Sequence, residues 1–128
     1  MRDMEESNMA KIFDSEYRFC LILWEHEPIN STCLVKLCKE KLGWSKATTY
    51  TVIRRLSERG VLKNENATVS ALISKEQAQH ERFEELVEKT FENSLPAFIA
   101  AFAHSGRLSK EDVSQLEAMI ENYSEDVC

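Results

Sequence analysis

Apolar residues recur at a helical spacing over most of the chain. Side chains at positions i, i+3, i+4 and i+7 share one face of a helix, and Tyr17, Cys20, Leu21 and Trp24 follow this spacing. Residues that cap or end helices separate the helical stretches. The pattern predicts helices over residues 14–26, 31–42, 46–59, 75–92, 95–104 and 109–123. The expected N-terminal caps are Asp14 or Ser15, Asn30 or Ser31, Ser45, Ser74 with Gln77, and Ser109 with Asp112.

The spacing changes from helical to extended between residues 61 and 73. Two runs of β-branched or apolar residues, 61–64 and 68–73, flank the turn-forming segment Asn64-Glu65-Asn66-Ala67. We therefore expect a short β-hairpin. Two short helices joined by a turn that contains glycine, followed by a hairpin, are typical of a winged helix-turn-helix.

The order of these elements predicts a mainly α fold in three parts. Residues 1–11 are polar and without pattern, so we expect a flexible N-terminal arm. Residues 12–74 hold the three helices and the hairpin of a winged helix-turn-helix domain. Residues 75–128 hold the remaining helices in a C-terminal domain.

The charge differs in sign along the chain. The 128 residues carry a net charge of −6. Residues 31–63 hold eight basic and two acidic residues, whereas residues 75–128 hold five basic and twelve acidic residues. A basic segment can face a polyanion that the acidic segment would repel, so the distribution indicates two roles in one chain.

The helix predicted over 46–59 has two distinct faces. Thr49, Val52, Ile53 and Leu56 form an apolar face, and the opposite face carries small hydroxyl residues beside arginines. Such a face also occurs on ordinary solvated helices, but its place before a hairpin in a basic segment favours contact with the DNA major groove. The helix N-terminus in turn favours a phosphate. We predict DNA contacts from Ser45, Lys46, Ala47, Thr48, Thr51, Arg54, Arg55 and Lys63, with Asn30, Ser31 and Thr32 as a second phosphate anchor.

The same stretch of sequence is similar to a known family. Residues 43–56 read GWSKATTYTVIRRL, and RGVL follows at residues 59–62. The residues that fit the family pattern are Trp44, Ser45, Thr48, Thr51, Arg55, Leu56 and Gly60. With these residues, the chain resembles the penicillinase repressor family over roughly residues 12–123. The resemblance implies a homodimeric transcriptional repressor that binds double-stranded DNA at an inverted-repeat operator and dimerises through its C-terminal helices.

The residues of the C-terminal domain lead independently to a dimer. About 50 residues in three thin helices cannot bury many large apolar side chains among themselves. Burying ten of them contributes on the order of 15–30 kcal/mol before entropy, and a second copy would complete such a core. The alternative is a monomer whose C-terminal helices fold back on the winged domain. The predicted dimerisation residues are Phe83, Leu86, Val87, Phe91, Leu95, Phe98, Ile99, Phe102, Leu116 and Ile120.

Three features depart from the family pattern. Family wings carry basic and aromatic residues, whereas this hairpin has one cation, Lys63, close to Glu65. Penicillin-responsive members are cleaved at an Asn-Phe bond, where this chain has Ala101-Phe102. Copper-responsive members end in a CxC pair, where this chain has a lone Cys128, and one thiolate cannot form a cluster. These departures leave three candidate inducing signals: a protease, a ligand inducer and oxidation of cysteines.

Other chemistry has little support in the sequence. Serine, histidine and aspartate do not group as a catalytic triad, no glycine-rich phosphate loop occurs, and the histidines lack metal-ligand spacing. We expect no enzyme activity, no metal and no cofactor. Cys20 and Cys38 are expected to be free core thiols, and the lack of a signal or membrane segment predicts a cytoplasmic protein. The competing hypothesis is a winged-helix module that binds an acidic partner protein, which the weakly basic hairpin keeps open.

Overall fold

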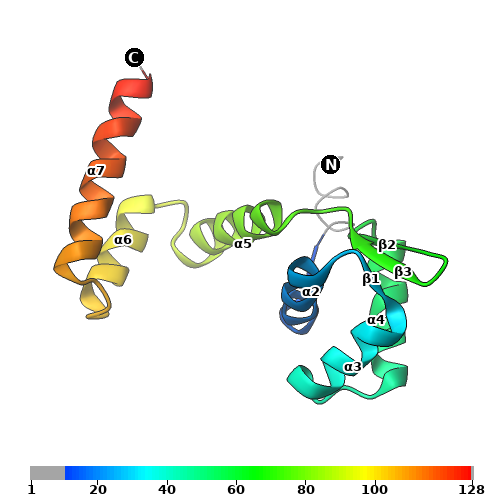
Figure 1. The fold of residues 1–128 in the computed structure, drawn as a ribbon. Coiled ribbons are helices and arrows are strands. Elements are labelled where there is room, and N and C mark those ends of the chain that lie inside the picture. The colour runs from blue at the N-terminus through cyan, green and yellow to red at the C-terminus, as the bar shows by residue number, and fades with distance from the viewer. Residues whose placement is uncertain (1–10, 128) are drawn as a thin grey trace. The chain divides into compact units, whose positions relative to one another are not determined.

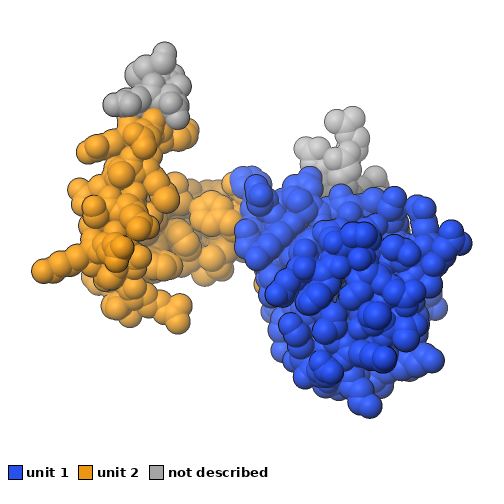
Figure 2. Space-filling model, in the orientation of Figure 1, with its two compact units in different colours: residues 1–81 blue, residues 82–128 orange. Residues whose placement is uncertain are grey.

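The computed structural model describes residues 11–127 (Figure 1). The chain divides into two compact units, residues 1–81 and 82–128 (Figure 2). The helices and strands are α2 (Asp14–His26), β1 (Ile29–Asn30), α3 (Ser31–Leu42), α4 (Lys46–Glu58), β2 (Leu62–Glu65), β3 (Thr68–Ala71), α5 (Lys75–Thr90), α6 (Leu95–His104) and α7 (Lys110–Val127). The predicted mainly α fold, with a winged helix-turn-helix followed by further helices, is confirmed. Most of the predicted arm, residues 1–10, and Cys128 lie outside the described residues.

The helices that follow α2 begin where short polar side chains cap them. Asn30 Oδ1 accepts the N–H of Thr32 at 2.8 Å, and Ser45 Oγ accepts the N–H of Thr48 at 3.1 Å. Each cap satisfies a backbone donor that has no partner within its helix. The predicted capping boxes also form, between Ser74 and Gln77 and between Ser109 and Asp112.

The predicted cap of the first helix is wrong. Phe13, rather than Asp14 or Ser15, is the N-cap residue of α2. Its N–H donates to Glu16 Oε1 at 3.0 Å, so a carboxylate from within the first turn reaches back to the cap. This arrangement is half of a capping box and needs no polar side chain at the cap position.

The sheet has one strand more than the predicted hairpin. Its strand order is β1-β3-β2, and both strand pairs are antiparallel. Ile29 pairs with Val69, and the two-residue β1 is too short to produce an alternating pattern in the sequence. The hairpin turn is also tighter than predicted, because only Asn66 and Ala67 connect the strands, with φ of 53° and 64°.

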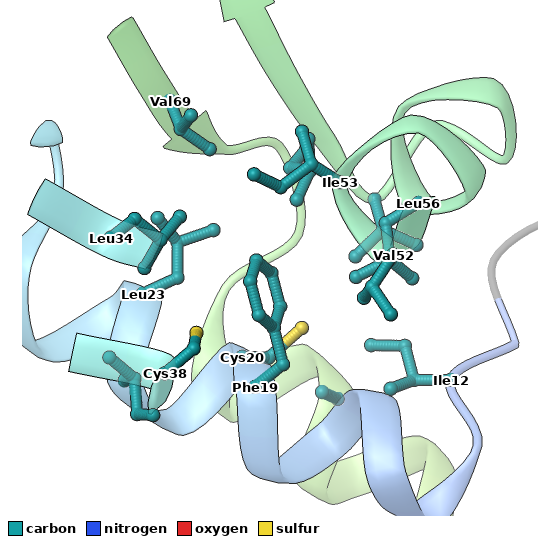
Figure 3. Packing of buried hydrophobic residues seen from close by; sticks show 14 residues of the cluster. Ile12, Phe19, Cys20, Leu23, Leu34, Cys38, Val52, Ile53, Leu56 and Val69 are labelled. Atoms are coloured by element: carbon teal, nitrogen blue, oxygen red, sulfur yellow. The ribbon is translucent and has the colours of Figure 1, made fainter. Parts of the chain in front are cut away.

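The core of the first unit lies between α2, α3, α4 and the sheet (Figure 3). Phe19, Leu23, Leu34 and Leu56 are fully buried there. The stripe predicted for the first helix is wrong in part, because Leu21 is 37% exposed while Phe19 and Leu23 form the centre of the buried face. A core residue of α5, Ala78, also belongs to this cluster.

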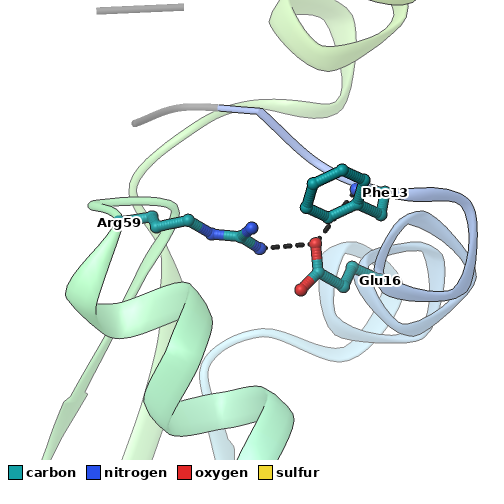
Figure 4. A network of polar contacts seen from close by, with 3 residues as sticks. All are labelled: Phe13, Glu16 and Arg59. Carbon is teal, nitrogen blue, oxygen red and sulfur yellow. Dashed lines mark hydrogen bonds and ion pairs between the residues drawn. The ribbon is translucent and has the colours of Figure 1, made fainter. Parts of the chain in front are cut away.

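Two polar contacts tie distant segments of the first unit together. Arg59, at the end of α4, forms an ion pair with Glu16 of α2 (Figure 4). The indole N–H of Trp24 donates to the carbonyl oxygen of Ile73 at 2.9 Å, which joins α2 to the segment after β3. These contacts fix the position of α4 and of the hairpin relative to α2.

The second unit has no buried side chain among its described residues. Its best packed group is an aromatic cluster in which the ring of Phe98 lies 5.5 Å from Phe83, 5.4 Å from Phe91 and 6.3 Å from Phe102, measured between ring centroids. Large apolar side chains of α7 are open to solvent, with Ile120 at 66%. None of the described helices is both long and apolar enough to span a membrane.

Candidate nucleic-acid interface

The turn between α3 and α4 sets the direction of α4. Gly43 ends α3 with φ of 71°, a left-handed conformation that costs glycine little. The next N–H, of Trp44, donates to the carbonyl oxygen of Cys38 at 3.3 Å. The ring of Trp44 stacks on that of Phe19, with centroids 6.0 Å apart and planes 7° apart. The turn is therefore anchored in the core directly before the capping residue Ser45.

The inner face of α4 holds the helix against the core. Thr49, Val52, Ile53 and Leu56 are buried, as predicted. Thr49 donates its hydroxyl proton to the carbonyl oxygen of Ser45 at 3.1 Å, so its polar group is satisfied in the interior. The opposite face of α4 is consequently the one that is turned to solvent.

The outer face of α4 places most of the predicted DNA-contacting side chains on one surface. Thr51 is half-buried at the edge of this surface. The remaining predicted side chains of the segment are exposed: Ser45, Lys46, Ala47, Thr48, Arg54 and Arg55. We call these seven residues the α4 outer face. It combines the positive end of the helix dipole, one lysine and two arginines, so it is suited to an anionic surface.

The start of the α4 outer face contains a pair of hydroxyl groups. Ser45 Oγ donates to Thr48 Oγ1 at 3.0 Å and accepts the N–H of Thr48 at 3.1 Å. The two contacts hold both side chains in one orientation at the first turn of the helix.

The start of α3 only partly matches the predicted phosphate anchor. Asn30 and Thr32 are exposed, although Asn30 Oδ1 is used as the helix cap. Ser31 is 4% exposed, its hydroxyl lies 3.3 Å from the hydroxyl of Tyr50, and its N–H donates to the carbonyl oxygen of Ala67 at 2.8 Å. Ser31 is therefore withdrawn as a DNA contact, because its polar groups are turned into the protein.

The hairpin carries little free positive charge. Lys63 Nζ lies 3.5 Å from Glu65 Oε1, and both side chains are exposed. The wing therefore presents a neutralised pair rather than a free cation.

The cysteines of the first unit differ in exposure. Burial, together with the nearby Glu16 carboxylate, raises the pKa of Cys20 to about 12, although the Arg59 guanidinium opposes part of this rise. Burial raises the pKa of Cys38 to about 11, although a hydrogen bond with Thr49 opposes part of this rise. Both thiols stay protonated near neutral pH, whereas Cys33 is exposed. Among the side chains described, those of residues 11–123, no three His, Cys, Asp or Glu are grouped so that they could hold a metal.

Sequence reasoning missed the partners that position this surface. Arg59 belongs to the basic segment 31–63, but its guanidinium pairs with Glu16 and lies 5.3 Å from the ring centroid of Phe13. The contact between the hydroxyls of Tyr50 and Ser31 has no signal in the sequence pattern. The position of Glu16 three residues after Phe13 is the one local signal of its capping role.

Comparison with known proteins gives one family. The family model described as "Penicillinase repressor" matches residues 12–122. An "uncharacterized 16.5 kDa protein in ptsI 3'region" of Latilactobacillus sakei is 31% identical over 121 residues, covering 88% of this chain and 80% of that protein. The "Penicillinase repressor" of Bacillus licheniformis is 20% identical over 119 residues, covering 90% of this chain and 93% of that protein.

Proposed function

The chain belongs to the penicillinase repressor family, and on this basis we propose that it represses transcription by binding a specific double-stranded DNA sequence as a homodimer. The family is one of regulators rather than enzymes. The observation that carries the proposal is the α4 outer face, on which exposed hydroxyl groups near the positive end of a well-anchored helix share one side of that helix with two exposed arginines.

The α4 outer face suits a DNA major groove. Threonine hydroxyls and methyl groups fit base edges and thymine methyls, and arginine binds guanine or phosphate with paired N–H groups. In this proposal Thr48, Thr51 and Arg55 contact bases or lie close to them. Phosphates are contacted by Lys46, Arg54 and the backbone at Ser45, with Asn30 and Thr32 at the edges, while Lys63 is held by Glu65.

The second unit supports association with another copy of the chain. Its exposed apolar side chains include Leu95, Ile99, Phe102 and Ile120, each more than two-fifths exposed. A two-fold partner is the commonest way in which soluble proteins cover such a surface. A symmetric dimer presents two copies of α4, so the operator is an inverted repeat with half-sites about one helical turn, or a multiple of it, apart.

The nature of the inducer is separate from this proposal. The proposed agents are a ligand, a protease or an oxidant acting on the free dimer or on its DNA complex. Ala101-Phe102 lies within α6, so a protease that cut there would need that helix to open locally. The buried, protonated thiols of Cys20 and Cys38 make them poor first targets for oxidation.

The test is enrichment of genomic DNA fragments by the purified full-length protein at about 100–150 mM salt, where non-specific binding is weak. We expect recovery of a shared inverted repeat. The Arg55→Ala variant should lose this repeat, while the Arg107→Ala variant, which removes the same charge from an exposed loop in the second unit, should keep it. Recovery of no shared sequence, together with capture of an acidic protein on the same surface, would favour the protein-binding alternative that the neutralised wing suggests.

A further inference from the structure

We propose that Thr48 is a specificity-determining hydrogen-bond donor and that Ser45 is a positioning residue that keeps the Thr48 hydroxyl proton available to DNA. The inference rests on the proposed function and specifies the kind of DNA atom that Thr48 contacts, which is a hydrogen-bond acceptor.

The hydrogen bonds between Ser45 and Thr48 have a defined direction. Ser45 Oγ accepts the N–H of Thr48 at 3.1 Å and donates its own proton to Thr48 Oγ1 at 3.0 Å. A hydroxyl has one proton to donate. The proton of Thr48 therefore cannot point back toward Ser45 and is directed elsewhere.

The adjacent threonine shows the usual fate of a helical hydroxyl proton. Thr49 is fully buried and donates to the carbonyl oxygen of Ser45 at 3.1 Å, as hydroxyls within helices commonly do. Thr48 is exposed, and the hydrogen bonds described over residues 11–127 give its proton no acceptor within the protein. Of the two neighbouring threonines, only Thr48 has a proton to offer outside the molecule.

The electrostatics of the first turn select the same kind of partner. Thr48 lies in the first turn of α4, where unpaired backbone N–H groups create a positive potential, and the exposed Lys46 adds a full charge. Electron-rich atoms are favoured there: purine N7, guanine O6, thymine O4 and phosphate oxygens. The amino groups of cytosine and adenine are disfavoured at the same place because they are donors.

The experiment begins with a duplex that the full-length protein selects from a randomised library. Affinity is then measured for duplexes with single base analogues that lack one acceptor each (7-deazapurine for N7, 2-aminopurine for guanine O6, 5-methyl-2-pyrimidinone for thymine O4) or with single methylphosphonates, which lack the phosphate charge. Thr48→Val should bind the unmodified duplex about tenfold more weakly than the wild type, and Thr48→Ser should stay within about twofold, as for a contact to a base edge. One of these modifications should weaken binding by the wild type about tenfold, as Thr48→Val does. The same modification should leave the affinity of Thr48→Val unchanged. A base analogue with this effect identifies a base acceptor, and a methylphosphonate identifies a phosphate. If no modification has this effect, the assignment of Thr48 as a donor to DNA is wrong.

The Ser45→Asn variant tests the positioning role. Asparagine caps helices as well as serine does, but its carbonyl oxygen has no proton and attracts that of Thr48. We expect Ser45→Asn to keep the thermal stability of the wild type. We also expect it to bind the modified and the unmodified duplex with the same affinity, unlike the wild type. A role in capping alone would leave the wild-type difference between the two duplexes unchanged and would overturn the assignment of Ser45.

The outcomes separate this inference from the proposed function. If Thr48→Val binds every duplex as tightly as Thr48→Ser, while Arg55→Ala loses binding, the inference is wrong and the repressor function stands. If the wild type selects no duplex, the proposed function fails and the inference fails with it.

Discussion

Arg59 and Glu16 form an ion pair between the end of α4 and the first turn of α2 (Figure 4). The side chain of Glu16 is 9% exposed and that of Arg59 is 23% exposed. The same carboxylate accepts the N–H of Phe13, whose ring lies 5.3 Å from the Arg59 guanidinium. One carboxylate thus caps α2 and holds the proposed recognition helix in place.

Replacing this carboxylate should destabilise the first unit. Glu16→Ala leaves a largely buried guanidinium and a backbone N–H without their acceptor, so the free energy of unfolding should fall by about 1–3 kcal/mol. Urea unfolding followed by the fluorescence of Trp24 and Trp44 measures this change. The control is Glu25→Ala on the exposed side of α2, which should change stability by less than about 0.5 kcal/mol. Equal effects of the two substitutions would contradict a structural role for the ion pair.

The hairpin turn should tolerate glycine better than its natural alanine. Ala67 has φ of 64°, in the left-handed region. That conformation costs a residue with a Cβ atom roughly 1–2 kcal/mol, and glycine relieves most of the cost. Ala67→Gly should therefore raise the free energy of unfolding, and Ala67→Val should lower it because a β-branched residue is more strained there. Urea midpoints of the three proteins test the order, and a lower midpoint for Ala67→Gly than for the wild type would refute the argument.

Local signals in the sequence predicted the helices and most of their caps. Asn30 and Ser45 satisfy donors two and three residues away, so their roles follow from neighbouring positions alone. The apolar face of α4 was predicted for the same reason, since its period is contained within one helix. The α4 outer face is therefore predictable from the sequence of this helix alone.

Contacts between distant segments could not be predicted in this way. Arg59 meets Glu16 across 43 residues, and Ser31 meets Tyr50 across 19 residues. Such pairs depend on how the helices pack, and a single sequence carries no local signal for that packing. This is why Ser31 looked like an exposed anchor and why Arg59 looked like a free basic residue.

Removing the acidic member of the wing pair should strengthen DNA binding. Glu65 lies 3.5 Å from Lys63 and neutralises the wing's cation. Glu65→Gln leaves Lys63 free to approach a phosphate, so the slope of log K against log salt should steepen by about 0.9, the value for one added phosphate contact. Affinity at low salt should rise by about two- to fivefold, in line with the small energy of an exposed pair.

The control for the wing is Glu117→Gln, which removes the same charge from α7. Its salt slope should equal that of the wild type in fluorescence anisotropy titrations. The double variant Lys63→Gln with Glu65→Gln should also return to the wild-type slope. A Glu65→Gln slope that matches the wild type would mean that the wing does not reach the DNA backbone.

Placing a charge on the apolar surface of α7 should disrupt the proposed dimer. Ile120 is 66% exposed in the single chain, and a dimer interface would bury it at a gain of about 1.5–3 kcal/mol per side chain. Ile120→Lys should shift the monomer–dimer equilibrium toward monomer in sedimentation equilibrium and weaken binding to the inverted repeat. Asn122→Lys introduces the same charge at a polar, exposed position and should leave both properties unchanged. A dimer of unaltered stability in Ile120→Lys would place the interface elsewhere.

The buried thiols should resist modification while the protein is folded. With pKa values of about 12 for Cys20 and about 11 for Cys38, their thiolate fractions at pH 8 are on the order of 10⁻⁴ and 10⁻³. Because the unfolded thiols ionise at lower pH than the folded ones, these groups favour the folded state below about pH 9, and this contribution falls as pH rises toward 11–12. Iodoacetamide at pH 8, read out residue by residue by mass spectrometry, should modify the exposed Cys33 in the folded protein and spare Cys20 and Cys38. In urea both buried thiols should react as well, and equal labelling of Cys20 and Cys33 in the folded state would restore direct oxidation of the core as an inducing signal.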